Sequence, residues 1–140
     1  MRAIHLRPFE VEIEIPIQTY DIDLMGVVSN ISYIRWLEDL RLKILGIYYP
    51  LERLLQEGIG PVLSETYIQY KRPVKILDKL VGRMWVSELD SPHWKLQAEF
   101  LRNGKVAAKA GQSGVFVRLE DGHPVPVPDE LMQKYNEFRV

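Results

Sequence analysis

The stretch that decides the fold runs from Thr19 to Trp36 and reads TYDIDLMGVVSNISYIRW. It places two carboxylates, Asp21 and Asp23, and then Gly26 between a predicted strand and the predicted start of an apolar helix. Glycine lets the backbone turn sharply or approach a ligand closely. Amides at a helix N-terminus are partly unused, and the helix dipole is positive there, so they can stabilise a developing negative charge. A catalytic site is easiest to assemble at this turn.

The residues on either side of the turn predict a strand and a helix. Apolar and polar side chains alternate over residues 9–17, which is the period of a half-buried strand. Pro16 favours an edge position or a bulge near the strand end. Ser29 or Asn30 is a suitable N-cap for the helix, and Gly46 is expected to end it. An apolar stripe predicts that this helix packs against a sheet. The stripe consists of Tyr33, Leu37, Leu40 and Ile44.

The rest of the chain predicts a short helix at 51–57, further strands and a short helix at 129–138. Asn103-Gly104 is typical of a two-residue type I′ hairpin turn. Gly111 and Gly114 indicate a bend or bulge in the last strand. The strands are expected at residues 62–71, 80–89, 94–100 and 105–118. We therefore expect one α+β domain over residues 1–140, with an antiparallel sheet of five to six strands wrapped around one long helix.

Composition excludes several function classes. The 18 basic and 19 acidic residues are mixed along the chain, so nothing indicates a nucleic-acid partner. The absence of cysteine excludes disulfides, thiolate metal sites and cysteine nucleophiles. His5, His93 and His123 are scattered, so no metal site is expected. With no signal-like or membrane-length apolar run, we expect a soluble, cytoplasmic protein.

Asp21 and Asp23 allow two interpretations. Aspartate is common in such turns because it forms Asx-turns and helix caps. A carboxylate beside a helix start can also act as a nucleophile or general base. In extended geometry the two side chains point to opposite sides, so one can face a cleft while the other holds the turn in place.

The motif D-x-D-x-x-G-V-V-x-N-x-x-Y-x-x-W-x-E-x-x-R, from Asp21 to Arg41, resembles the signature of hotdog-fold acyl-CoA thioesterases of the 4-hydroxybenzoyl-CoA thioesterase class. Segments 67–80, 111–117 and 122–128 are similar to later parts of that family, so the resemblance spans about residues 9–132. It implies a hotdog fold, Asp23 as the catalytic carboxylate and the Asn30 amide as the group that polarises the thioester carbonyl. Asp21, Gly26 and Tyr33 are expected to support them.

Outside the motif, two features are candidates for substrate contacts. Glu65 lies on a predicted strand and is either an exposed strand residue or a contributor to the site. Lys71, Arg72 and Lys75 form the densest basic cluster, which is either a solvated turn or a patch that meets the phosphates of coenzyme A. A sheet with an open edge also predicts a homodimer, or a homotetramer.

Thioester hydrolysis fits these residues chemically. A thiolate leaves readily, so the reaction requires a carboxylate and an oxyanion donor, and neither a metal nor another cofactor. The rival interpretation is a non-catalytic acyl- or CoA-binding hotdog protein, which an Asp23 bonded to its own turn would favour. Aromatic, short-chain and long-chain acyl-CoA substrates stay open, as do acyl-carrier-protein thioesters.

Overall fold

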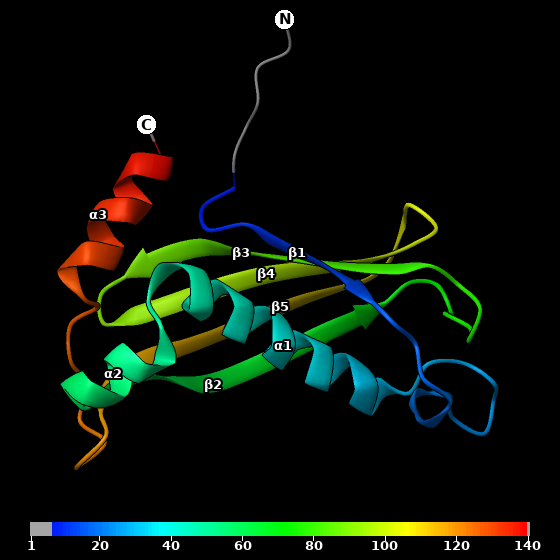
Figure 1. Ribbon diagram of the computed structural model, residues 1–140, viewed down its shortest axis with the longest axis horizontal. Coiled ribbons are helices and arrows are strands. Elements are labelled where there is room, and N and C mark those ends of the chain that lie inside the picture. Colours follow the sequence, from blue (N-terminus) through cyan, green and yellow to red (C-terminus); the bar gives the residue numbers. More distant parts are fainter. Residues whose placement is uncertain (1–6, 140) are drawn as a thin grey trace, which may run out of the picture.

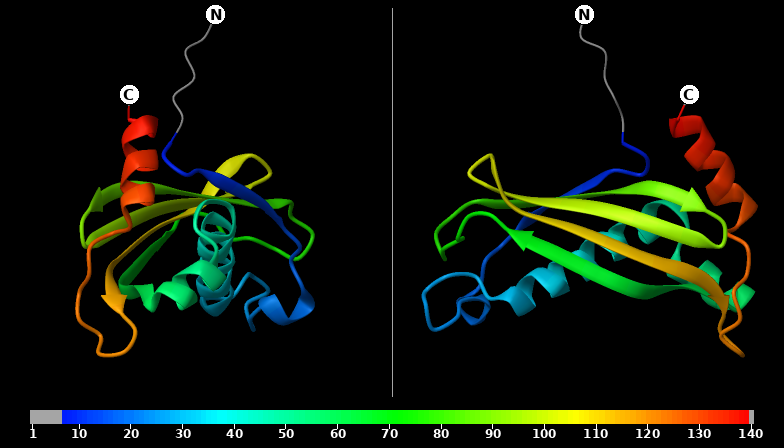
Figure 2. Two further views of the ribbon diagram at one scale, coloured as in Figure 1. Left: turned by 60° about the vertical axis from the view of Figure 1, so that its left-hand side comes forward. Right: turned by 180° about the vertical axis from the view of Figure 1, so that it is seen from behind.

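The computed structural model describes residues 7–139, which form one antiparallel sheet, three α-helices and a short 3-10 turn, η1 (Figure 1). The sheet has five strands in the order β1-β3-β4-β5-β2. The strands are β1 (Val11–Ile15), β2 (Ile59–Tyr70), β3 (Leu80–Asp90), β4 (His93–Arg102) and β5 (Lys105–Arg118). The helical elements are η1 (Thr19–Asp21), α1 (Asn30–Tyr48), α2 (Leu51–Glu57) and α3 (Asp129–Phe138). The sheet curves around α1, as the end-on view shows (Figure 2), which confirms the predicted fold class.

β1 is an edge strand, as Pro16 predicted, and pairs with β3. It is shorter than the 9–17 range that alternation suggested. Phe9 adopts a positive φ of 58° in a turn before the strand, and Pro16 follows Ile15 directly, so the ladder stops at both ends. Val11 and Ile15 are buried while Glu12 is exposed, which confirms the half-buried pattern.

α1 begins as expected and ends later than expected. Ser29 is the N-cap, and its Oγ accepts a hydrogen bond from the Ile31 amide at 3.2 Å. The predicted apolar stripe is buried against the sheet, and burial of each such side chain contributes about 1.5–3 kcal/mol. The prediction that Gly46 ends the helix is wrong, because α1 continues to Tyr48. Pro50 disfavours a helical Tyr49, and this sets the end of α1.

The later elements follow the sequence pattern closely. Asn103 and Gly104 both have positive φ, 49° and 85°, which confirms the type I′ turn between β4 and β5. β2 begins at Ile59, three residues earlier than predicted, and pairs with β5. The α2 and α3 helices lie where they were predicted. Within residues 7–139, no helix combines the length and the apolar character that a membrane span needs.

The glycines of β5 mark an irregular region, but the predicted bulge lies in its partner strand. The register of β2 against β5 shifts between Leu63 and Glu65, opposite Gly114. A Cβ on Gly114 would lie 2.0 Å from the Val62 carbonyl oxygen and 2.3 Å from the Trp94 ring. Gly114 is therefore needed because β2 and the indole of Trp94 both approach its backbone closely.

Candidate active site

The turn between β1 and α1 is a small closed loop. Ile22 and Val28 form an antiparallel bridge, and the Asp23 amide donates to the Val27 carbonyl at 2.9 Å. The Gly26 amide donates back to the Asp23 carbonyl at 3.0 Å, and Gly26 has a φ of 78°. A left-handed residue of this kind is best accommodated by glycine, so Gly26 supports the turn through its backbone. We call residues 21–30 the site turn.

Asp21 holds the site turn against the start of α1. Its carboxylate is buried and accepts hydrogen bonds from the Gln18 amide and from the Ser32 hydroxyl, each at 2.8 Å. The Asp21 carbonyl accepts from the Ser29 amide at 2.7 Å. Two residues of α1 or its cap are thus tied to one aspartate, which is the holding role expected for one member of the pair.

Asp23 has the opposite environment. Its side chain is exposed, and Oδ1 accepts hydrogen bonds from the Met25 amide at 2.8 Å and from the Val27 amide at 3.4 Å. This is the contact with its own turn that favours the non-catalytic interpretation. Oδ2, in contrast, accepts no hydrogen bond from any residue between 7 and 139. One oxygen orients the carboxylate, and the other faces solvent.

The amide of Asn30 is the free donor at the helix start. Asn30 is the first residue of α1 and is exposed. The next two amides are occupied, since Ile31 donates to Ser29 Oγ and Ser32 donates to the Ser29 carbonyl at 3.1 Å. Among the described residues the Asn30 amide has no acceptor. It combines an open hydrogen-bond donor with the positive end of the helix dipole.

Tyr33 lies behind the site turn in an aromatic cluster. Its ring centroid is 5.3 Å from those of Trp36 and Tyr70 and 5.1 Å from that of Phe100. Burial, with a smaller contribution from Tyr70, raises the pKa of Tyr33 to about 12. The phenol therefore stays protonated at neutral pH, and its place in the cluster anchors the first turn of α1 to the sheet.

The loop between β2 and β3 brings the basic cluster to the site turn. The Val28 amide donates to the Val74 carbonyl at 2.7 Å, and both segments lie at the same end of the molecule (Figure 1). Lys71, Arg72 and Lys75 are all exposed, and an Arg72 guanidinium nitrogen donates to the Val106 carbonyl. The three basic side chains therefore lie on a loop that is in direct contact with the candidate site.

Glu65 is not brought to the site turn within one protomer. It is exposed on β2, next to Thr66. Thr66 Oγ1 accepts from Gln112 Nε2 at 3.0 Å, and Gln112 Oε1 accepts from Arg41 of α1 at 2.7 Å. Thr66 thus faces the helix, and the alternation of side chains along a strand directs Glu65 to the opposite face.

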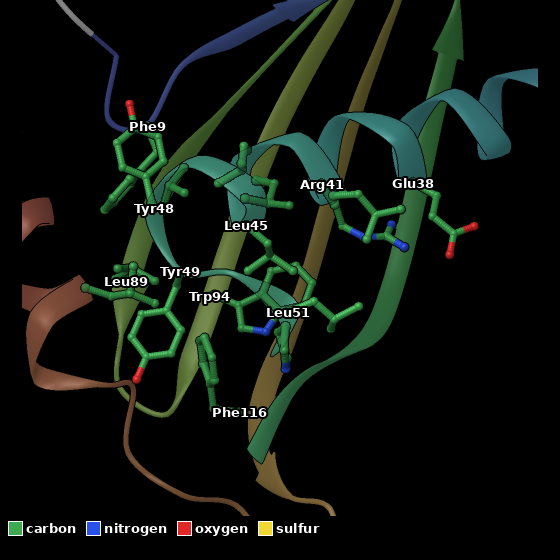
Figure 3. Close-up of a pocket in the computed structure, with 16 residues that line it drawn as sticks. Phe9, Glu38, Arg41, Leu45, Tyr48, Tyr49, Leu51, Leu89, Trp94 and Phe116 are labelled. Carbon is green, nitrogen blue, oxygen red and sulfur yellow. The ribbon is translucent and has the colours of Figure 1, made fainter. Parts of the chain in front are cut away.

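A cavity of about 250 Å³ lies at the other end of α1, and sequence reasoning missed it (Figure 3). Residues from nearly every element meet there, so only the folded arrangement reveals it. Burial lowers the pKa of Arg41 at its edge, and the nearby Glu38 raises it. The walls are otherwise apolar or aromatic. They include Phe9, Leu42, Ile44, Leu45, Tyr48, Tyr49, Leu51, Pro61, Val86, Leu89, Trp94, Leu96, Phe116 and Leu131.

No group of three or more histidine, aspartate or glutamate side chains that could hold a metal ion occurs within residues 7–139. His93 and His123 are both exposed, and His5 lies outside the described residues.

A curved antiparallel sheet around one central helix, with an acidic turn at the helix start, defines a hotdog-fold protein. Residues 17–135 match the model of the Thioesterase-like superfamily, and the chain belongs to that superfamily. Its enzyme class is accordingly that of the thioester hydrolases.

Three similar proteins place the chain among its relatives. A DHNA-CoA thioesterase from Staphylococcus aureus superposes with a TM-score of 0.81 at 18% identity, covering 93% of this chain and 89% of the other. A 1,4-dihydroxy-2-naphthoyl-CoA thioesterase from Synechocystis superposes with a TM-score of 0.82 at 16% identity. The superposition covers 94% of this chain and 98% of the other. A curated relative from Aquifex aeolicus (strain VF5), provisionally named as an esterase, is 25% identical over 118 residues. The match covers 84% of this chain and 91% of the relative. At these identities the two superposed structures are evidence for the fold.

Proposed function

We propose that the protein hydrolyses acyl-CoA thioesters to a free acid and coenzyme A at the site turn. One observation carries the proposal: the free Oδ2 of Asp23 lies on the same short turn as the unpartnered amide of Asn30. A thioester hydrolase needs such a pair, because one group must activate or deliver the nucleophile and another must stabilise the oxyanion.

The reaction follows from these two groups. Asp23 takes a proton from a water molecule, whose oxygen attacks the thioester carbonyl carbon, or its own carboxylate attacks that carbon directly. The Asn30 amide donates a hydrogen bond to the oxyanion that forms. The carbon–sulfur bond then breaks, and the thiolate takes up a proton as it leaves. After direct attack, the acyl group is left on Asp23 as a mixed anhydride, which water hydrolyses to the free acid and the restored carboxylate. Asp21 and Gly26 hold the turn in shape, and Tyr33 fixes the helix start.

The basic loop gives the substrate a place for its charged end. Coenzyme A carries several phosphate charges far from its thioester, and Lys71, Arg72 and Lys75 are exposed on the loop joined to the site turn. In the proposal these side chains bind the phosphates. An acyl-carrier-protein thioester presents the same pantetheine arm, and would use the basic loop for an acidic protein surface instead.

A homodimer is part of the proposal. Apolar side chains are exposed on one flank of α1 and on the edge strand β2, and an apolar surface beside an open sheet edge is typical of a protein–protein contact. A second copy placed there would cover the patch and bring its own β2, with Glu65, toward the first protomer. The exposed residues are Ile31, Ile34, Leu42, Val62, Leu63 and Tyr70.

A binding protein without activity is the second candidate, and the bond between Asp23 Oδ1 and its own turn favours it. A thiol-release assay over acetyl-, butyryl-, benzoyl-, lauroyl- and palmitoyl-CoA separates the two. Turnover of at least one substrate that depends on Asp23 supports the enzyme. Saturable binding of acyl-CoA with no thiol release by the wild-type protein supports the binding protein.

A further inference from the structure

The cavity is polar on the side nearer the site turn and apolar on the other side. Figure 3 shows Glu38 and Arg41 on one side, with Phe9, Tyr48 and Leu89 on the opposite side. Glu38 and Arg41 come earlier on α1, so the polar side points toward the helix start. None of residues 21–30 lines the cavity, so a ligand anchored at the site turn would lie along α1, reach the charged groups first and end among the apolar side chains.

Of the two charged groups at the cavity edge, Arg41 is held by neighbouring side chains, whereas Glu38 is exposed and accepts no hydrogen bond from another side chain within residues 7–139. Arg41 donates to Gln112 at 2.7 Å, and Gln112 donates to Thr66 at 3.0 Å. Trp94 lines the cavity with its indole, and Nε1 is enclosed too tightly for a water molecule to reach it. The interior offers aliphatic and aromatic surface, which favours contact with a hydrocarbon chain.

The distance from the site turn to the cavity sets the length of a ligand that would reach it. With a rise of about 1.5 Å per residue, Glu38 lies about 12 Å along α1 from Asn30, and Leu45 about 22 Å. A fully extended chain advances roughly 1.2 Å per bond, since a residue of three bonds spans up to about 3.6 Å. An acyl chain held at Asn30 would enter the cavity after about 10 carbons and fill it at about 18.

We infer that this cavity takes the distal end of a long acyl chain, so that the substrates of the proposed function are fatty acyl-CoA thioesters of about 10–18 carbons. The inference rests on the proposed function, which places the thioester carbonyl at Asn30. A benzoyl or naphthoyl group is too short to reach from Asn30 to the cavity, and would leave its apolar walls without contact.

The first test compares kcat/KM across acyl-CoA chain lengths from 4 to 16 carbons, below micelle-forming concentrations, with benzoyl-CoA alongside. We expect kcat/KM to rise at least tenfold between butyryl- and myristoyl-CoA. Leu51→Trp places a larger side chain at the cavity wall and should lower kcat/KM for palmitoyl-CoA at least tenfold, while butyryl-CoA is unaffected. A flat chain-length profile, or benzoyl-CoA as the best substrate, overturns the inference.

Leu55→Trp is the matched control. Leu55 lies one turn further along α2, is exposed to a similar degree, and does not line the cavity. It should leave the chain-length profile unchanged, and equal effects of the two tryptophans would contradict the inference. Thermal melting of both variants verifies that each is folded.

A binding measurement separates this inference from the proposed function. Calorimetric titration with palmitate alone should show saturable binding to wild type and Leu55→Trp, weakened at least tenfold in Leu51→Trp. Palmitate binding without hydrolysis of any thioester would remove the proposed activity and keep the acyl site. Hydrolysis of short acyl-CoA without palmitate binding would keep the activity and remove the acyl site.

Discussion

The two ends of α1 are built in contrasting ways. At its N-terminus an exposed turn is shaped by backbone hydrogen bonds to Asp21 and Asp23. Toward its C-terminus a partly open cavity is shaped by side chains from almost every element. Hydrogen bonds from backbone amides fix the orientation of a side chain, which suits a group that reacts. Packed apolar side chains fix the volume of a cavity, which suits selection of an acyl chain by its length. Because both lie along α1, the length of the helix sets the distance between the site turn and the cavity.

The largest effect is expected at the polar end. Asp23→Asn keeps an oxygen that can accept the Met25 and Val27 amides but loses the charge, so kcat should fall by roughly 10²–10⁴-fold. The unfolding free energy should change little, because the turn contacts remain. Thiol-release kinetics with urea unfolding of the same sample measures both quantities. A variant with near-wild-type turnover would remove Asp23 from the reaction.

Substitution of Asp21 should mainly lower the unfolding free energy, whereas substitution of Asp23 should mainly lower kcat. Asp21→Ala leaves the buried Ser32 hydroxyl and the Gln18 amide without an acceptor, which should lower the unfolding free energy by about 3 kcal/mol. Asp23→Ala is the comparison and should cost less than about 1 kcal/mol, since its partners are exposed. Equal destabilisation by the two substitutions would show that the two aspartates do not divide the roles in this way.

Charge reversal in the basic loop sharpens the contrast between binding and chemistry. Lys71→Glu with Arg72→Glu should raise KM for acyl-CoA about tenfold and leave kcat nearly unchanged, because the phosphates lie far from the reacting carbonyl. The effect should shrink at high salt, since exposed charges are screened over about 10 Å at 0.1 M. Lys95→Glu, exposed on β4 toward the opposite end of the sheet, serves as the control. An unchanged KM in the double variant would identify the cluster as a solvated loop.

The smallest effect concerns the end of α1 near the cavity. Gly46 lies inside the helix, and a Cβ there would have no atom within 4 Å. Gly46→Ala should therefore stabilise the protein by about 0.5–1 kcal/mol. Gly114→Ala should be strongly destabilising, because its Cβ would collide with the Val62 carbonyl. Urea unfolding that gave the two substitutions the same sign would contradict this account.

Local patterns in the sequence predicted most of the fold, while long-range pairing escaped them. Alternation predicted β1, and Asn103-Gly104 predicted the hairpin, because each signal depends on neighbouring residues. The prediction from Gly46 was wrong because glycine is tolerated within a helix, and α1 continues to Tyr48 and stops at Tyr49, the residue before Pro50. The pairing of β2 with β5 instead of β3 depends on distant surfaces that no local pattern encodes.

In the candidate site, too, the residues close together in sequence were predictable, and the contacts between distant residues were not. Asp21, Asp23, Gly26 and Asn30 lie within ten residues, so a turn signature could place them together. The contact between Val28 and Val74 and the cavity both join residues far apart in sequence. The basic loop was found from its composition, but its contact with the site turn could only come from the structure.

The strand order has a consequence for how the chain is made. Val11 pairs with Met84, and Ile59 pairs with Arg118, so the two strands synthesised first occupy the outer edges of the finished sheet. Hairpins such as β3–β4 and β4–β5 can form within microseconds, whereas closing distant pairs is slow. During synthesis, β1, α1 and β2 emerge before their partners exist. The nascent chain must therefore keep the apolar face of α1 and an unpaired β2 from aggregating until β5 leaves the ribosome.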